Sequence, residues 1–185
     1  MGSACVSALN LKRATTACKP AAISASDWAG DEGNSEADIL VIARAFHAAG
    51  ADIIDVSAGQ TTTEAKPIYG RMYQASYADW VRNEVGIATM TVGAVTTPDQ
   101  VNTLLAAGKA DLVALARPHL ANPYFTLQAS AWYQHSPQHW PRQYLTARDQ
   151  AFRNAERERA ELKDLRIKAR PASHEVVEPG VKRAA

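Results

Sequence analysis

Two short segments rich in small residues carry the chemistry that this sequence suggests. Val92-Gly-Ala-Val95 and Leu115-Ala-Arg-Pro118 each lie at the end of a short apolar run. Small residues let a ligand approach the backbone, whose N–H groups can donate to phosphate oxygens. The planar guanidinium of Arg117 suits a phosphate dianion. The alternative is a tight turn at Gly93 and an arginine paired with a carboxylate, and the spacing alone leaves both interpretations open.

The elements that must position these segments follow an alternating pattern. Short runs of β-branched and small residues predict four buried parallel strands, at residues 22–26, 52–57, 88–92 and 112–116. Helical spacing of apolar residues lies between them, over 35–49, 77–85 and 98–107. Ser35 with Asp38 forms a candidate capping box, and Pro98 is placed as a first helical residue. The pattern therefore predicts helices that connect neighbouring parallel strands.

The predicted strands begin roughly 25 to 35 residues apart, which is the length of a βα unit. Such an alternation fits either a doubly wound sheet or part of a (β/α)8 barrel. A complete barrel needs eight units and about 250 residues. Because four units are present, we expect an α/β fold that forms half of a TIM barrel.

The chain divides into four predicted segments. We expect an atypical, disordered leader over residues 1–21 and the half barrel over 22–150. A run of Arg and Glu with alternating charge predicts a helix over 146–168, and we assign 151–169 as a separate charged helix. The polar, proline-containing residues 170–185 are expected to form a disordered tail.

Composition excludes several classes of function. The 185 residues carry a net charge of +1, which gives no electrostatic case for binding nucleic acid. No apolar run approaches the roughly 20 residues that a membrane helix needs. The two cysteines, Cys5 and Cys18, are expected to be free thiols in a reducing compartment. We therefore expect a cytoplasmic protein that binds neither nucleic acid nor a membrane.

Other polar residues are more consistent with structural roles. His135 and His139 have a spacing found in metal sites, but no cysteine or acidic cluster accompanies them, so we expect no metal. Asp52 is placed just before its strand, and Asp55 in a helix interface or a barrel layer. The segment Tyr69–Tyr73 lies in a long loop that either covers substrate or packs on its own aromatic rings.

Four ordered motifs resemble the Old Yellow Enzyme (NADH:flavin oxidoreductase) family. They match the family's fifth to eighth strands and are Ile23–Trp28, Asp52–Gly59, Val92–Val95 and Ala110–Leu120. Further runs resemble the reductase half of bifunctional salicylyl-CoA 5-hydroxylases and anthraniloyl-CoA monooxygenases, at Gly59–Gln60, Tyr69–Met72, Arg82–Glu84 and Trp140–Tyr144. The resemblance covers about residues 22 to 150. It implies the C-terminal half of the barrel, strands five to eight, followed by a charged C-terminal helix.

The resemblance also implies a cofactor and its site. The family uses FMN, with NAD(P)H as reductant and a small-molecule substrate, for which an aromatic acyl-CoA is one candidate. Residues at matching positions hold the FMN phosphate, namely Gly93, Ala94, Ala116 and Arg117. Ser57 and Gly59 match positions near the ribityl chain.

One departure from the family falls at Ala22. The family's fifth-strand motif begins with an arginine that contacts the flavin ring, and this chain has Ala22 there. The family's first four strands supply most of the catalytic groups, and residues 1–21 leave no room for them. We therefore expect an N-terminally truncated member of the family, with no catalytic residue and no turnover by itself.

Two other functions remain possible from the sequence. A half barrel exposes strand edges, and open edges seek partners. The chain could thus be a non-catalytic assembly module that pairs with itself or with a separate N-terminal half. A different phosphate-binding barrel would need a catalytic lysine or acid at a strand end, and none is evident.

Overall fold

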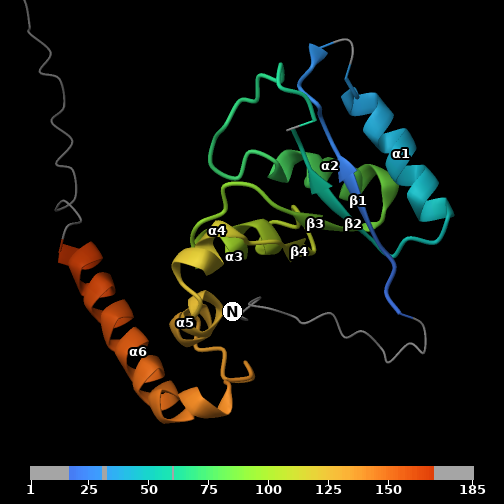
Figure 1. Cartoon of the computed structure of the whole chain (residues 1–185). Helices are drawn as coiled ribbons and strands as arrows, with labels where there is room; N and C mark the ends of the chain where they lie inside the picture. Colours follow the sequence, from blue (N-terminus) through green and yellow to red (C-terminus); the bar gives the residue numbers. More distant parts are fainter. Residues whose placement is uncertain (1–16, 31–32, 60, 169–185) are drawn as a thin grey trace, which may run out of the picture. The chain divides into compact units, whose positions relative to one another are not determined.

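A computed structural model describes residues 17–30, 33–59 and 61–168 of the chain. The described residues fall into two compact units that divide between Ala129 and Ser130. Figure 1 gives the labels of the helices and strands used below. The predicted leader and tail lie largely outside the described residues, and the predicted domain boundaries stay a prediction.

The first unit is built on a four-stranded parallel sheet. Its strands are β1 (Pro20–Ser24), β2 (Ile53–Ser57), β3 (Ala88–Thr91) and β4 (Leu112–Val113). They pair in sequence order, β1-β2-β3-β4, and every pair is parallel. A parallel sheet with helical connections confirms the predicted α/β class and is consistent with part of a TIM barrel.

Three helices connect the strands, and α1 and α3 begin where the sequence carries a helix-start signal. They are α1 (Glu36–Ala48), α2 (Ala75–Val85) and α3 (Pro98–Ala106). Ser35 accepts a hydrogen bond from the Asp38 N–H, and the Asp38 carboxylate accepts one from the Ser35 N–H. The predicted capping box is therefore confirmed, as is Pro98 in the first turn of α3.

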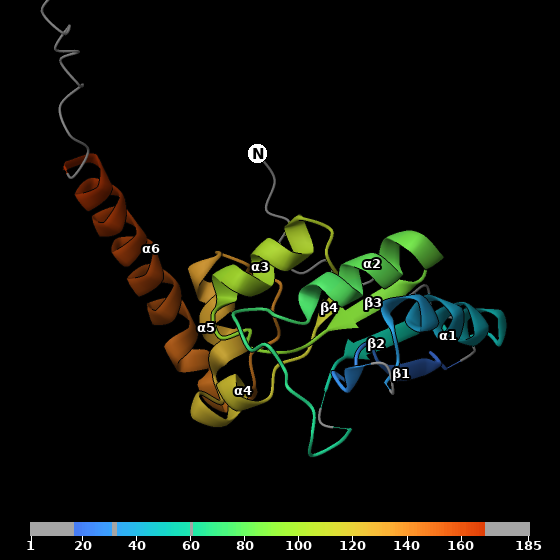
Figure 2. The same ribbon diagram turned by 90° about the horizontal axis from the view of Figure 1, so that it is seen from above.

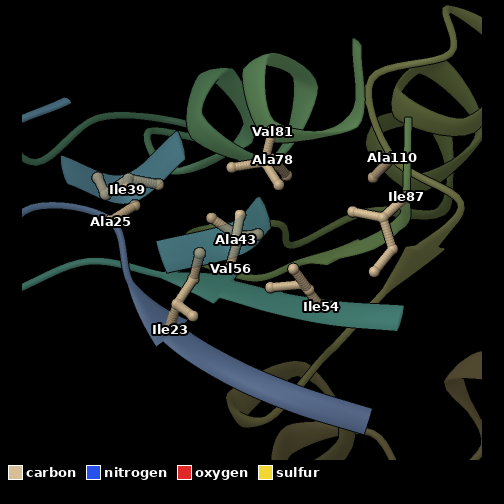
Figure 3. Close-up of a cluster of buried hydrophobic side chains, with 10 residues drawn as sticks. All are labelled: Ile23, Ala25, Ile39, Ala43, Ile54, Val56, Ala78, Val81, Ile87 and Ala110. Carbon is tan, nitrogen blue, oxygen red and sulfur yellow. The ribbon is translucent and has the colours of Figure 1, made fainter. Parts of the chain in front are cut away.

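One face of the sheet packs against α1 and α2. Alternate residues of the strands point to this face, because successive side chains in a strand alternate sides. Figure 3 shows the resulting core, formed by Ile23, Ala25, Ile39, Ala43, Ile54, Val56, Ala78, Val81, Ile87 and Ala110. A smaller cluster of Ala75, Val95 and Leu104 joins α2, the β3–α3 loop and α3.

The opposite face of the sheet carries a different row. In the register of the strands, Ala22, Asp55, Met90 and Leu112 lie side by side. Ala22 and Leu112 are exposed, while Asp55 and Met90 are half-buried. This face therefore mixes small, apolar and ionisable side chains, unlike the apolar face under the helices.

The pairing of β3 with β4 is reinforced by one carboxylate. Asp111, just before β4, accepts hydrogen bonds from Arg82 Nε at 3.0 Å and Arg82 Nη2 at 3.2 Å. The same carboxylate accepts from the Thr89 N–H at 2.9 Å. The Asp111 carboxylate raises the pKa of Arg82 through this hydrogen bond and its charge. The two-residue strand β4 is thus anchored to α2 and β3 by its flanking residue.

Two short helices follow β4. They are α4 (Arg117–Ala121) and α5 (Phe125–Trp132). Figure 2 shows α4 and α5 in a view from above. The strand predicted at 22–26 runs two residues earlier, so Pro20 and Ala21 of the predicted leader belong to β1.

The second unit is organised around the long helix α6 (Leu145–Lys168). A short 3-10 helix, η2 (Arg142–Tyr144), precedes it. The buried ring of Trp140 lies 6.3 Å from the ring of Phe152, between centroids. Leu162 and Leu165 are exposed on this charged helix.

Candidate functional site

The turn after β3 is the first part of the candidate site. Gly93 and Ala94 both adopt positive φ, +102° and +50°, a conformation that favours glycine. No described residue accepts a hydrogen bond from the N–H group of Gly93 or Ala94. Successive backbone N–H groups without an acceptor are donors of the kind that bind anions in turns.

The segment after β4 is the second part. Thr91 and Val113 are paired in the sheet, so Gly93 and Ala116 follow neighbouring strands at the same edge. Ala116 is the residue before α4, and Arg117 is its first residue. Among the described residues, none accepts from the N–H groups of Ala116 and Arg117, and none forms an ion pair with the exposed Arg117 side chain. The alternative in which Arg117 pairs with a carboxylate is therefore not seen in the described part of the chain.

The end of β2 lies beside these two segments, but its groups are already engaged. Ser57 Oγ donates to the Ile23 carbonyl at 3.4 Å, and the Gly59 N–H donates to the Ser26 carbonyl at 2.8 Å. Gly59 has a φ of +87°, and a Cβ there would lie 3.7 Å from the Trp28 ring. Ser57 and Gly59 thus tie the ends of β1 and β2 together.

A buried glutamine that the sequence analysis did not single out connects the ends of β2 and β3. Gln74 Nε2 donates to the Ala58 carbonyl at 3.1 Å and also bonds to the Tyr73 hydroxyl. The Met72 N–H donates to the Ala94 carbonyl at 3.3 Å. A polar residue ahead of a helix usually reads as an exposed cap, so nothing in the sequence marks Gln74 as buried.

The row of Ala22, Asp55, Met90 and Leu112 contains one acidic side chain, that of Asp55, and no basic one. Asp55 pairs in register with Ala22, whose methyl group has no charge to offer. Asp55 Oδ1 is buried and has no hydrogen-bond partner among the described residues, and this burial raises the pKa of the Asp55 carboxyl. Among the described residues, the row of Ala22, Asp55, Met90 and Leu112 therefore has a carboxyl group and no basic side chain.

Aromatic side chains close the loop between β2 and α2. The rings of Trp28, Tyr69 and Tyr73 contact one another, with centroids 5.5 to 6.4 Å apart. Trp28 Nε1 donates to the Tyr77 hydroxyl at 3.2 Å. A cavity of about 420 Å³ lies beside them, lined by Trp28, Gly30, Lys66, Ile68, Tyr73 and Tyr77. Of the two interpretations of this loop, the contacts favour packing on its own aromatics, and the cavity leaves room for a ligand beside them.

The remaining candidates show no chemistry. The His119 ring packs edge-on against Phe125, with centroids 5.5 Å apart. Across the described ranges, no cluster of three or more His, Cys, Asp or Glu side chains has the arrangement of a metal site. None of the described helices combines the length and the apolar character needed to cross a bilayer.

Comparison with known proteins identifies the class of protein that this fold and site define. The model of the NADH:flavin oxidoreductase / NADH oxidase family matches residues 23–134, and the chain belongs to that family. The matched range includes the carboxyl ends of all four strands and the two candidate phosphate-binding segments, Val92–Val95 and Leu115–Pro118. The cofactor of the family is FMN, and its reductant is NAD(P)H.

The similar curated proteins are bacterial NADPH dehydrogenases. One from Geobacillus sp. (strain WCH70) is 40% identical over 108 residues, and one from Halalkalibacterium halodurans is 36% identical over 108 residues. One from Listeria welshimeri is also 36% identical over 108 residues. In each case the match covers 58% of this chain and 31% of the relative. The chain therefore spans about a third of the length of the relatives it matches.

The described residues fit one end of FMN and not the other. Unengaged N–H groups at Gly93, Ala94 and Ala116, together with the exposed Arg117, are donors of the kind that hold a phosphate. On the β1 side, Ala22 provides no donor, and the nearest register partner is the acid Asp55. Donors suited to a phosphate are therefore present after β3 and β4. The described residues in the row of Ala22 include no basic side chain.

Proposed function

We propose that this chain provides the phosphate-binding part of the FMN site in an NAD(P)H oxidoreductase of the ene-reductase type. The N–H groups of Gly93 and Ala94, with Ala116 and Arg117, hold the phosphate. Ser57 and Gly59 lie toward the ribityl chain. The observation that supports this most is the pair of neighbouring strand ends with free backbone donors and an unpaired arginine.

The proposed roles of the chain's own residues are binding and orientation. Among the described residues, no acceptor takes a hydrogen bond from the N–H groups of Gly93, Ala94, Ala116 and Arg117, so these groups can donate to an anion. Arg117 adds a formal charge and a planar pair of donors, which a lysine would not match. When bound, FMN supplies two-electron transfer between NAD(P)H and a substrate.

We further propose that the chain performs no turnover by itself. Ala22 stands at the position where the family's motif has an arginine, and the neighbouring group is the acid Asp55. A negative group beside a reduced, anionic flavin ring would oppose its formation. Reduction of an enone by the pure chain with NADPH and added FMN would contradict this part of the proposal.

The decisive experiment is a titration of the purified chain with FMN, followed by flavin fluorescence. Riboflavin, which lacks the phosphate, serves as the second ligand, and Arg117→Ala as the variant. We expect FMN to bind more tightly than riboflavin. Removing one charged hydrogen-bond donor costs roughly 1.5–3 kcal/mol, so Arg117→Ala should weaken FMN binding by roughly 10- to 150-fold.

A matched control is Arg142→Ala, since Arg142 is an exposed arginine in η2 of the second unit. It should leave the FMN affinity unchanged. Equal affinities for FMN and riboflavin in a folded sample would end the proposal of a phosphate site.

The substrate and setting are finer proposals that follow from the resemblance of the sequence. We propose that the substrate of the complete protein is an aromatic acyl-CoA thioester and that the reaction belongs to a monooxygenase system. We also propose a cytoplasmic location, because NAD(P)H is the reductant. The proposed substrate is supported by the resemblance of the motifs at Tyr69–Met72 and Trp140–Tyr144. Retention of the chain on immobilised CoA, and release by free acyl-CoA, is the expected result.

A second function, as an assembly module, is favoured by the uncovered face of the sheet. The row of Ala22, Asp55, Met90 and Leu112 includes two exposed residues and a buried carboxylate oxygen without a partner. A second copy or a separate N-terminal half that covered this face would bury apolar surface and give Asp55 a donor. Light scattering should then report a dimer, and a monomer with cooperative unfolding would exclude self-pairing.

A further inference from the structure

Gln74 is a buried polar residue between the end of β2 and the turn after β3, which is one of the two segments of the proposed phosphate site. It precedes α2, and only 5% of its surface is exposed. Its Nε2 donates to the Ala58 carbonyl, one residue beyond β2. Since a carbonyl oxygen can only accept, this bond determines which end of the side-chain amide faces β2.

The aliphatic part of Gln74 occupies the space that a side chain at position 93 would need. A Cβ added to Gly93 would lie 2.9 Å from Gln74 Cδ and 3.1 Å from Gln74 Cγ. Real Cβ atoms do not approach so closely, so Gln74 and Gly93 fit only because position 93 has no side chain. The glutamine therefore packs directly against the turn that offers the free N–H groups.

The amide of Gln74 is retained although part of it is unsatisfied. Its Oε1 is buried and has no hydrogen-bond partner among the described residues. An unpartnered buried acceptor costs free energy comparable to what the Ala58 bond contributes. A methionine would fill a similar volume without that cost, so packing alone gives no reason for an amide at this position.

We propose that Gln74 is a positioning residue for the phosphate site. By bonding to Ala58 and packing on Gly93, it sets the turn Gly93–Ala94 at a fixed distance from the end of β2. The turn then keeps the single conformation in which both N–H groups are free to donate. This inference rests on the proposed function, and it assigns to that site a residue that makes no phosphate contact itself.

The test uses the full 185-residue chain with Gln74→Met, which keeps the length of the side chain and removes its hydrogen bonds. Gln134→Met is the matched control, because Gln134 Nε2 also donates to backbone carbonyls, those of Ala131 and Phe152. Both variants are titrated with FMN and with riboflavin. We expect Gln74→Met to reduce the preference for FMN over riboflavin about tenfold. Riboflavin binding should stay unchanged, and Gln134→Met should keep the full preference.

A second measurement needs no flavin. The ¹⁵N order parameters of Gly93 and Ala94, near 0.85 for a rigid backbone, should fall below about 0.6 in Gln74→Met. Those of Ile54 in β2 should not change, which separates loss of positioning from general unfolding.

The outcomes distinguish this inference from the proposed function. If the wild-type chain prefers FMN and Gln74→Met keeps both that preference and a rigid turn, the positioning role is overturned. If the wild-type chain shows no preference for FMN, the proposed function fails. The order parameters of Gly93 and Ala94 then still decide whether Gln74 holds the turn.

Discussion

The ends of β3 and β4 differ from the β1–β2 side of the sheet in how they present charge. At Gly93 and Ala94 the free groups are backbone N–H donors, and Arg117 adds a full positive charge. At Ala22 and Asp55 the unpaired group is a carboxylate, and no basic side chain shares its row. The ends of β3 and β4 therefore carry groups that attract an anion, and the ionised Asp55 carboxylate beside Ala22 would repel one.

The two regions differ in charge because one relies on backbone N–H groups and the other on individual side chains. An anion site made of backbone N–H groups requires only a turn with the correct φ values, which a few small residues ensure. A basic group in the row of Asp55 would require one particular side chain at one position, and position 22 holds an alanine there.

The largest expected effect comes from filling the space at Gly93. Gly93→Val would bring a side chain against Gln74 and Tyr73, whose nearest carbons lie 2.9 and 3.0 Å from an added Cβ, at a φ of +102°. Overpacking and the left-handed backbone together should cost about 3 kcal/mol of stability. FMN affinity should fall more than roughly 100-fold. Thermal unfolding and flavin titration measure the two effects.

Gly86→Val serves as the control for backbone strain alone. Gly86 also has a positive φ, +73°, but an added Cβ would meet no atom within 4 Å. It should destabilise the chain by about 1 kcal/mol and leave FMN binding unchanged. Equal effects of the two variants on FMN binding would show that the turn at Gly93 has no special role.

The next effect concerns Asp55, whose pKa is raised by burial. Because the folded pKa lies above the unfolded value, the fold favours the protonated acid. That stability is complete below the ordinary pKa of 3.8 and is lost as pH rises through the folded pKa. At neutral pH, Asp55→Asn should therefore raise the unfolding temperature only slightly, by no more than about 2 °C, because solvent screens a carboxyl that is only partly buried. The gain should disappear in unfolding curves recorded near pH 3.

A smaller effect tests whether the two regions differ in stability as well as in charge. Thr97 caps α3 after the phosphate-type turn, and Ser35 caps α1 after the β1 loop. Thr97→Ala and Ser35→Ala should each lower stability by about 0.5–1 kcal/mol in denaturant unfolding. Similar losses would show that charge is the main difference between the regions. A loss confined to one variant would show that one region folds more loosely.

The smallest expected effect is a gain from a new ion pair. Ala22→Arg would place a guanidinium beside Asp55 in the strand register. Since position 22 is exposed, the ion pair should raise the free energy of unfolding by only about 0.5 kcal/mol, and added salt should reduce this gain. The same substitution in an Asp55→Asn background should give no gain. A gain of equal size in both backgrounds would contradict the pairing of Ala22 with Asp55.

The sequence was sufficient to predict the elements whose signals are local. Buried strands gave short apolar runs, and the capping box at Ser35 and the proline at position 98 marked helix starts that the structure confirms. The membership of the family was equally accessible, because its motifs follow the strand ends in order. The extra helix α4 was missed, since five residues are too few to show a helical period.

Features that depend on contacts between residues far apart in the sequence could not be predicted from the sequence. Gln74 looks like an ordinary polar residue before a helix, and its burial follows from the approach of Ala58 and Gly93. Asp55 was assigned to an interface or barrel layer, but its unpartnered oxygen depends on which residue lies opposite in the sheet. Both properties come from strand register and packing, which a single sequence does not determine.

Trp28 gives the molecule an optical signal of its own. Its indole N–H bonds to the Tyr77 hydroxyl, its carbonyl accepts from the Lys66 N–H, and its ring contacts Tyr69 and Tyr73. A tryptophan held among aromatic rings has strong near-ultraviolet circular dichroism, and its emission depends on those neighbours. Movement of the loop that carries Lys66 and Tyr69 would change this spectrum without any added label. Comparison with Trp28→Phe separates its contribution from those of the other three tryptophans.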